Sequence, residues 1–505
     1  MISRSPVFPD VQKDISPCSD ALLVLIIVKK GGKVKGLERI RDYTYELPMT
    51  GRMRVPGRIY TSEDMLEQLL SDRALEQVAN VATLPGITDF SFGMPDIHMG
   101  YGFPIGGVAA VDVDHGVVSP GGVGSDINCG VRLLKTPLKH DDIKHKIKDI
   151  LTQLFHEIPT GIGKYGKITL SDKELQSVLI RGSRWAVENG YGTSEDLLNT
   201  EEHGALAGAK PRAISKRAFK RGLSQLGTLG SGNHFLEIQL VEKIYDTSTA
   251  HSFGLSEGDI TIMIHTGSRG LGYQVCDDYA KGLIPRMSSY GIRVPDMQLA
   301  CAPIDSNDGR AYISAMAGAA NYAWANRQII THWTRNVISE FFDIPYNDLE
   351  LLYDVAHNIA KFERHRNHDF LVHRKGATRA FGPGRPELPQ HYSKTGQPVI
   401  IPGDMGTASY ILAGTDKAMT ETFGSTCHGA GRVMSRSKAL KTKRGEKVIE
   451  DLRKKGIEIL AQGMRTVAEE MPEAYKSIDN VVDIVHNVGI SKKIARLIPL
   501  GVIKG

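Results

Sequence analysis

Glycine is unusually frequent in this chain, with 53 glycines among 505 residues, against about 7% in average proteins. Glycine adopts positive φ angles freely and has no side chain, so it lets the backbone turn sharply and lets a ligand approach closely. The excess therefore predicts many tightly shaped loops. We expect the chemistry of the protein in its glycine-rich stretches.

Composition indicates a large globular protein, because 41% of the residues are hydrophobic and 24% are charged. The net charge of +5 permits an anionic partner but is too small to diagnose nucleic-acid binding. The five cysteines are odd in number and form no CxxC pair. This pattern argues against a disulfide framework or a zinc ribbon. It favours a reducing compartment, and we predict a cytoplasmic protein.

The longest apolar run covers only the eight residues 21–28, whereas a membrane span needs about 20. No secretory signal pattern is present, so we expect no membrane association. Residues 1–34 are interpreted as an N-terminal extension, disordered or an over-called start, with a buried strand as the alternative. Residues 35–505 are predicted to form one large domain, since no linker or repeat divides them.

Hydrophobic patterning predicts interleaved helices and short strands. A capping-box pattern at 61–64 predicts the start of a helix. Residues 312–342 predict one or two buried helices, in which Met316 and Trp324 are interpreted as core residues. Short strands are predicted at 107–113, 235–241, 260–264, 349–355 and 398–401. Because these elements lack a regular βαβ rhythm, we predict an α+β fold with short strands and helices around a central site.

Four loops or strand ends place a metal-capable side chain beside small residues. Residues 119–130 (SPGGVGSDINCG) hold Asp126 and Cys129, and His234 stands at the head of the strand 235–241. His265 ends an apolar strand, and His357 follows another. Strand ends can gather distant residues on a rigid base. Any one histidine alone would more often be structural, but together the loops supply five candidate ligands.

Mixed thiolate, imidazole and carboxylate ligands suit a borderline divalent metal. The ligand types alone do not identify the ion, because zinc binds such groups more tightly than manganese does. Five ligands exceed what one open tetrahedral site usually takes, and a thiolate can bridge two metals. The residue count therefore predicts a pair of ions.

A fifth loop, residues 422–432 (TFGSTCHGAGR), places His428 before Gly429, Ala430 and Gly431. Closely approaching backbone N–H groups of this kind can hold a phosphate, although the loop is not a Walker A motif. His428 is therefore a candidate nucleophile or general acid/base. Basic residues cluster at 210–221 and 432–444, which favours a nucleic-acid backbone as ligand, while a solvated helix face is the alternative.

Several of these segments, in order and in register, resemble the RtcB family of RNA-splicing ligases. They are Pro95–Gly106 (PDIHMGYGFPIG), the loop 119–130, His265–Gly270 (HTGSRG) and Cys427–Arg432 (CHGAGR), within a resemblance that runs from about Leu37 to Gly505. The resemblance implies a single α+β ligase domain, and residues 1–34 fall outside it.

The resemblance also implies an activity, which is GTP- and manganese-dependent RNA ligation in tRNA splicing and RNA repair. An RNA end with a 2′,3′-cyclic phosphate or 3′-phosphate is joined to a 5′-hydroxyl end through a guanylylated histidine. RNA is the expected partner, with an archease protein as a further one.

Carried over by motif, His428 is the nucleophile and Cys129 bridges two manganese ions. Asp126 and His234 complete one metal site, and His265 and His357 the other. The implied guanylate contacts are Asn233, Glu237, Asn358, Asp404, Ser409, Gly429, Ala430, Gly431, Tyr475 and Lys504. Predicted RNA contacts are Lys220, Arg221, Arg269, Arg432 and Arg436, with the GTP triphosphate as the alternative ligand of Arg432.

Two other functions compete with ligation. A metal-dependent RNA cyclic phosphodiesterase would need the metal ligands but not His428 or GTP. A non-catalytic RNA-binding protein would need the basic clusters alone. The complete ligand set together with His428 argues against both.

Overall fold

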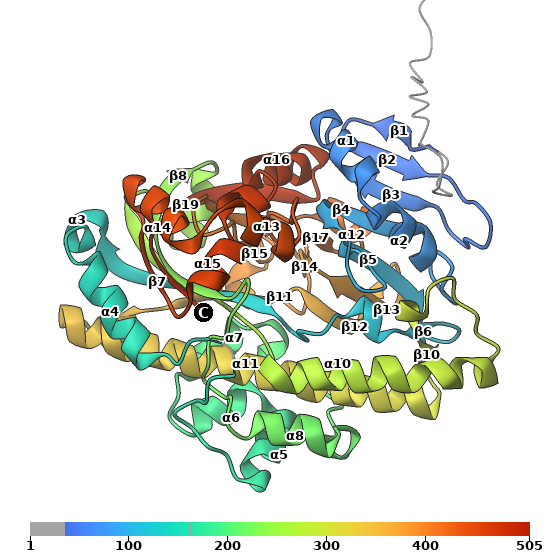
Figure 1. The fold of residues 1–505 in the computed structure, drawn as a ribbon, viewed down its shortest axis with the longest axis horizontal. Coiled ribbons are helices and arrows are strands. Elements are labelled where there is room, and N and C mark those ends of the chain that lie inside the picture. Colours follow the sequence, from blue (N-terminus) through green and yellow to red (C-terminus); the bar gives the residue numbers. More distant parts are fainter. Residues whose placement is uncertain (1–35, 162) are drawn as a thin grey trace, which may run out of the picture.

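Two large sheets divide the strands between them, as the computed structural model of residues 36–161 and 163–505 shows (Figure 1). The seven-stranded sheet has the order β1 (Glu38–Arg41), β2 (Thr44–Leu47), β3 (Gly57–Tyr60), β4 (Ser91–His98), β5 (Ile105–Asp112), β13 (His368–Lys375) and β12 (Asn358–His365). The predicted extension 1–34 lies outside the described residues.

The eight-stranded sheet has the order β11 (Leu351–Ala356), β7 (Gly130–Lys139), β9 (Asp259–Thr266), β8 (Phe235–Ile244), β19 (Ser491–Lys504), β16 (Ser409–Gly414) and β15 (Pro398–Ile401), with β18 (Glu458–Ala461) parallel to β19. Two short pairs join β6 (Val117–Val118) to β10 (Ala302–Pro303), and β14 (Ala377–Arg379) to β17 (Ser425–Cys427). All five predicted strands are confirmed, within about two residues at most ends.

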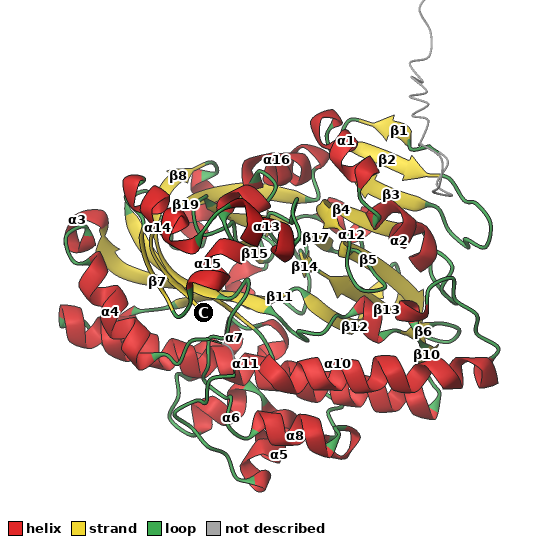
Figure 2. Cartoon of the chain, in the orientation of Figure 1, coloured by secondary structure: helices red, strands yellow, loops and turns green. Residues whose placement is uncertain are grey.

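Helices surround both sheets (Figure 2). They are α1 (Glu63–Ser71), α2 (Ala74–Val81), α3 (His140–Ile143), α4 (Ile147–Glu157), α5 (Asp172–Arg181), α6 (Ser183–Glu188), α7 (Ser194–Leu198), α8 (Lys216–Gly222), α9 (Thr247–Ser252), α10 (Arg269–Leu283), α11 (Asn307–Phe342), α12 (Asp416–Glu421), α13 (Arg436–Thr442), α14 (Gly445–Lys454), α15 (Met464–Glu469) and α16 (Ile478–Val488). Helices and strands alternate within one large domain, which confirms the predicted α+β class. No helix in the described part of the chain is long and apolar enough to cross a membrane.

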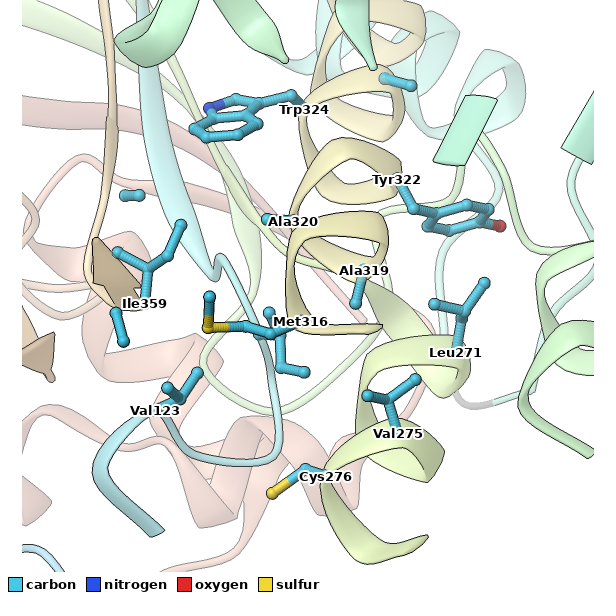
Figure 3. Close-up of a cluster of buried hydrophobic side chains, with 14 of the residues drawn as sticks. Val123, Leu271, Val275, Cys276, Met316, Ala319, Ala320, Tyr322, Trp324 and Ile359 are labelled. Carbon is cyan, nitrogen blue, oxygen red and sulfur yellow. The ribbon is translucent and has the colours of Figure 1, made fainter. Parts of the chain in front are cut away.

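The long helix α11 carries much of the core. Its start is capped by Ser306, whose side chain accepts the Gly309 N–H, which satisfies one of the free donors of the first turn. Met316 and Trp324 are 1% and 0% exposed and belong to the largest hydrophobic cluster. Figure 3 shows Met316 beside Val123 and Ile359, so α11 packs both against the glycine-rich loop and against β12. The prediction of core residues is confirmed, and the segment forms one helix.

The predicted capping box at 61–64 is wrong in its detail. Helix α1 does begin there, but Ser62 occupies the cap position and makes no side-chain hydrogen bond to the helix. The apolar face supplies the stability instead, because Met65, Leu66 and Leu69 are buried.

Candidate metal and nucleotide site

Strand register brings the five predicted metal ligands to one edge of the eight-stranded sheet. Phe235 of β8 pairs with His265 of β9, which places His234 beside His265. Val131 of β7 pairs with the same His265, so the Asp126–Cys129 loop reaches this edge as well.

His357 follows β11, which pairs with β7 on the side opposite β9. Ala356, at the end of β11, pairs with Gly130 of β7. The chain then leaves the eight-stranded sheet at His357 and enters β12 of the seven-stranded sheet. His357 therefore stands at the junction of the two sheets.

The ligand atoms lie close together in two overlapping groups. Asp126, Cys129 and His234 form one group, and Cys129, His265 and His357 form the other, each with ligand atoms within 4.8 Å of one another. The Cys129 Sγ atom lies 3.5 Å from His234 Nε2 and 3.3 Å from His265 Nε2. Cys129 is the member common to both groups, as a bridging thiolate would be.

The electrostatics of the cluster fit cations. Burial, reinforced by the Asp126 carboxylate, raises the pKa of Cys129 well above its usual value, so a thiolate there needs a nearby positive charge. Burial opposes ionisation of Asp126, but His234 and Arg269 together outweigh it and lower the pKa of Asp126 to about 2. Burial also lowers the pKa values of His265 and His357 well below the usual range. Neutral imidazoles, a carboxylate and a thiol in a buried cluster form a donor set for one or two divalent metals.

Other buried side chains hold the ligand loop in shape. Asn128 has a positive φ of 53°, and Arg327 of α11 donates from Nη1 to its carbonyl at 2.8 Å and to the Thr266 carbonyl at 2.9 Å. The Arg327 guanidinium also pairs with the Asp354 carboxylate at 2.8 Å, and both side chains are fully buried. Arg327 thus fixes the segments on either side of Cys129 and His265. The role of Arg327 could not be predicted from the sequence, because Arg327 reaches this loop only through the packing of α11.

His428 follows β17, in a loop that packs onto the end of β4. The buried carboxylate of Asp96 accepts the backbone N–H of His428 at 2.9 Å and its Nδ1–H at 2.5 Å. Burial opposes ionisation of Asp96, but the contact with His428 outweighs it, and the pKa of Asp96 is lowered. Because an ionised carboxylate only accepts, Nδ1 carries a proton, and in the neutral ring the free lone pair is on Nε2. Among the described residues Nε2 has no hydrogen-bond partner, and His428 lines a cavity.

We call this cavity the catalytic cavity, because the candidate nucleophile lines it. It has a volume of about 160 Å³, and most of the predicted guanylate contacts lie in its lining. Its lining includes Asn233, Asp404, Gly429, Ala430, Gly431, Tyr475 and Lys504 of those predictions, together with the predicted nucleophile His428 and with His98, His265 and Glu470. The short centroid distance of 5.0 Å between the His357 and His428 rings places the candidate nucleophile directly beside the ligand cluster.

Three predicted guanylate contacts lie outside this lining. Asn358 supports the ligand loop, because its Nδ2 donates to the Asp126 carbonyl at 3.1 Å. Glu237 is buried, and Gln239 connects it to Ser409 by donating to Glu237 Oε2 at 2.8 Å and to Ser409 Oγ at 3.1 Å. Ser409 Oγ in turn accepts the N–H of Gly403, which does line the cavity.

The predicted RNA contacts fall into three places. Lys220 and Arg221 lie on α8, with Lys220 exposed and the Arg221 guanidinium 6.0 Å from the Tyr273 ring. Arg269 is tied to the ligand cluster, since its Nη1 lies 3.0 Å from His234 Nδ1.

Arg432 and Arg436 instead form part of the catalytic cavity wall, where both pair with Glu470, at 2.8 and 2.9 Å. Burial opposes ionisation of Glu470, but Lys504 and the two arginines lower its pKa to about 2.

Sequence reasoning missed Asp96 and Glu470 as site residues. Asp96 stands within the segment 95–106 that carried the resemblance, two residues before His98, so a signal for it was present. Glu470 belongs to no motif, and only the folding of residues 469–475 against the Cys427–Arg432 loop brings it to the cavity.

Comparison with known proteins agrees with this arrangement. The family described as "tRNA-splicing ligase RtcB" matches residues 77–505. A protein named "tRNA-splicing ligase RtcB" from Archaeoglobus fulgidus is 57% identical over 477 residues, covering 93% of this chain and 99% of the relative. One of the same name from Methanococcus maripaludis is 55% identical, covering 92% and 99%. An "RNA-splicing ligase RtcB" from Mycobacterium tuberculosis is 52% identical, covering 85% and 100%. With a family match over most of its length and relatives above 50% identity, the chain belongs to the RtcB family.

Proposed function

We propose that the protein is a GTP-dependent RNA ligase of tRNA splicing and RNA repair. It joins an RNA end bearing a 2′,3′-cyclic phosphate or 3′-phosphate to an RNA end bearing a 5′-hydroxyl. One observation carries the proposal: His428, oriented by Asp96, opens with a free Nε2 into a cavity beside five metal-capable side chains. The printed names of the relatives supply the RNA substrate class.

His428 performs the first step. Its Nε2 attacks the α-phosphorus of GTP, so a P–N bond forms and the bond to pyrophosphate breaks. The Nδ1–H donated to Asp96 stabilises the positive charge that the ring gains during attack. Backbone N–H groups of the Gly429–Gly431 segment are suited to hold the guanylate phosphate.

Manganese fits this donor set: Asp126, Cys129 and His234 would hold one ion, and Cys129, His265 and His357 would hold the other. Bound there, Mn²⁺ would stabilise negative charge that develops on the phosphate oxygens. Arg269 contacts one member of this donor set, because its Nη1 lies 3.0 Å from His234 Nδ1, while Nε2 of the same ring faces Asp126 and Cys129.

The remaining steps transfer the guanylate to RNA. Once a cyclic phosphate has been opened by water, an oxygen of the RNA 3′-phosphate displaces the His428 imidazole and takes the guanylate. The 5′-hydroxyl oxygen then attacks the RNA 3′-phosphorus, and GMP leaves. Lys220, Arg221, Arg432 and Arg436 are proposed to hold RNA phosphates during these steps, and an archease protein to assist the first one.

Asp96→Asn tests the orientation of the nucleophile. An asparagine removes the charge that selects the Nδ1–H tautomer, so we expect the rate of guanylylation to fall by about 10²- to 10⁴-fold, while GTP binding changes little. The measurement is single-turnover labelling with α-³²P-GTP. Asp305→Asn, at an exposed carboxylate, is the matched control. Wild-type labelling rates in Asp96→Asn would contradict the role.

The buried position of Glu237 leads us to predict that GTP binding depends on pH. Burial raises the pKa of Glu237 to about 8, and its Oε1 has no hydrogen-bond partner among the described residues. We propose that this oxygen accepts the N–H groups of guanine, which requires the ionised form. Below pH 8 binding must then displace a proton, so the affinity for GTP should fall by about tenfold per pH unit from pH 8 to pH 6.

The pH experiment uses calorimetry on His428→Ala protein, which prevents adduct formation. ATP measured in parallel corrects for titration of the triphosphate. The Glu237→Gln change should flatten the dependence, because an amide does not titrate. If GTP affinity were the same at pH 6 and pH 8 in the presence of Glu237, another group would read the base.

Two assays test the proposed function as a whole. Purified protein is incubated with α-³²P-GTP and Mn²⁺ to detect a protein-bound label, and then with RNA ends of each kind to detect joining. Label transfer followed by joining is the expected result. Opening of cyclic phosphates without label or joining would instead identify an RNA cyclic phosphodiesterase.

A further inference from the structure

Three arginines line a second cavity, separate from the catalytic cavity. It has a volume of about 540 Å³, and Arg52, Arg54, Arg293 and His115 line it together with Tyr290 and neutral residues, without a carboxylate. The lining comes from the loop between β2 and β3, the turn after α2 and the segment before β10, which meet at one edge of the molecule (Figure 1). We call it the arginine cavity.

The arginines of this cavity carry uncompensated charge. None of the three forms an ion pair within residues 36–161 and 163–505; Arg54 donates only to the Thr83 carbonyl, at 3.1 Å. Arg52 and Arg293 are exposed. Guanidinium groups gathered in this way repel one another unless an anion lies between them, and their planar forks match phosphate oxygens.

A larger cavity, of about 950 Å³, adjoins the arginine cavity. Arg52 and Thr83 line both of these cavities, and Met99 and Gly100 line only the larger one. His98, the preceding residue, lines the catalytic cavity. The arginine cavity and the larger cavity therefore adjoin each other, and the chain segment 98–100 links the lining of the larger cavity to that of the catalytic cavity.

Two exposed methionines, Met99 and Met297, line this larger cavity, and Tyr101 lies two residues beyond Met99. Met99, Tyr101 and Met297 are 53%, 45% and 56% exposed. Their two segments are joined by the Gly102 N–H, which donates to Gln298 Oε1 at 2.9 Å. The charges here are partly compensated, since Arg73 pairs with Glu76 at 3.0 Å. The aromatic ring of Tyr101 can stack with a base, whereas the carboxylates of Glu76 and Asp296 disfavour phosphates in this cavity.

We propose that an RNA strand leaving the ligation site runs along these cavities. Its bases contact Met99, Tyr101 and Met297, and its backbone phosphates further along are held by Arg52, Arg54 and Arg293. The inference rests on the proposed function and extends it, because it assigns a binding site for RNA several nucleotides away from the joined ends.

The test uses full-length protein with Arg52, Arg54 and Arg293 changed to alanine. The control changes Lys148, Lys243 and Lys394 to alanine, three exposed lysines without an ion pair in the described structure. RNA affinity is measured by fluorescence anisotropy over a salt series, with RNAs of about 4 and about 20 nucleotides that end in a 3′-phosphate. Labelling with α-³²P-GTP is measured separately.

A length-dependent loss would support the site. The arginine variant should bind the long RNA about tenfold more weakly, with a salt slope smaller by about 2, which corresponds to three phosphate contacts on a single strand. Binding of the short RNA and labelling by GTP should equal those of wild type. This result would support the site even if the wild type formed no adduct, because binding and guanylylation are read separately.

Two outcomes would overturn the proposal. If the long RNA bound to the arginine variant and to the lysine control with the same affinity and salt slope, the arginines would not contact RNA, and an acidic protein surface would fit them better. If short and long RNA lost affinity equally, the contact would lie at the joined ends and not along the cavities.

Discussion

Replacing His428 by alanine is expected to abolish the covalent guanylate adduct, and RNA joining with it, by more than about 10³-fold. The imidazole Nε2 is the one free nucleophilic nitrogen that both lines the catalytic cavity and is oriented by an ionised carboxylate among the described residues. Without it the α-phosphate of GTP has no acceptor, whereas the metal ligands stay in place. The measurement is autoradiography after incubation with α-³²P-GTP and Mn²⁺.

The adduct has a chemical signature as well. A phosphoramidate on histidine is labile in acid and stable in alkali, so brief acid treatment should release the label from the wild-type protein. His391→Ala, in an exposed position away from the cavity, should label as wild type does. Persistent labelling of His428→Ala would place the nucleophile on another residue.

The Cys129→Ser change is expected to weaken both metal ions together, by about 100-fold or more, and to prevent guanylylation. Serine keeps the approximate shape but loses the soft thiolate, and Cys129 belongs to both ligand groups. Calorimetric titration with Mn²⁺ measures the number of ions and their affinities. A variant that lost only one ion would show that the second site does not need Cys129.

A matched control separates this effect from the cost of burying a hydroxyl. Cys301 is as deeply buried as Cys129 but has no part in either ligand group. The Cys301→Ser change should therefore lower the free energy of unfolding while leaving Mn²⁺ stoichiometry at the wild-type value. If Cys301→Ser also lost metal, general destabilisation would explain the Cys129 result.

The sequence allowed five of the nineteen described strands and a cluster of metal-capable side chains to be predicted, because both depend on local patterns. Apolar runs followed by histidine indicated β9 and β11. The glycines around Asp126 and Cys129 indicated a tightly turned loop. The four cysteines in the described part of the chain are unpaired and buried, as the absence of CxxC pairs indicated.

What could not be predicted depends on contacts between distant segments. Asp96 and His428 are separated by 332 residues, and no periodicity relates a buried strand to a loop so far away. The pairing of Glu470 with Arg432 and Arg436 is of the same kind. The run of basic residues in the sequence indicated that these two arginines belong to a basic surface. In the structure they form part of the cavity wall.

The position of β19 also affects when the eight-stranded sheet can be completed during folding. Residues 491–504 form a strand that lies between β8 and β16, so the eight-stranded sheet has a gap until those residues have been made. Lys504, at the end of that strand, pairs with Phe235, next to His234. The cavity wall that Lys504 contributes is therefore absent until β19 has paired with β8. Such long-range strand insertion is slow compared with local folding, so we expect this part of the cavity to form late in folding.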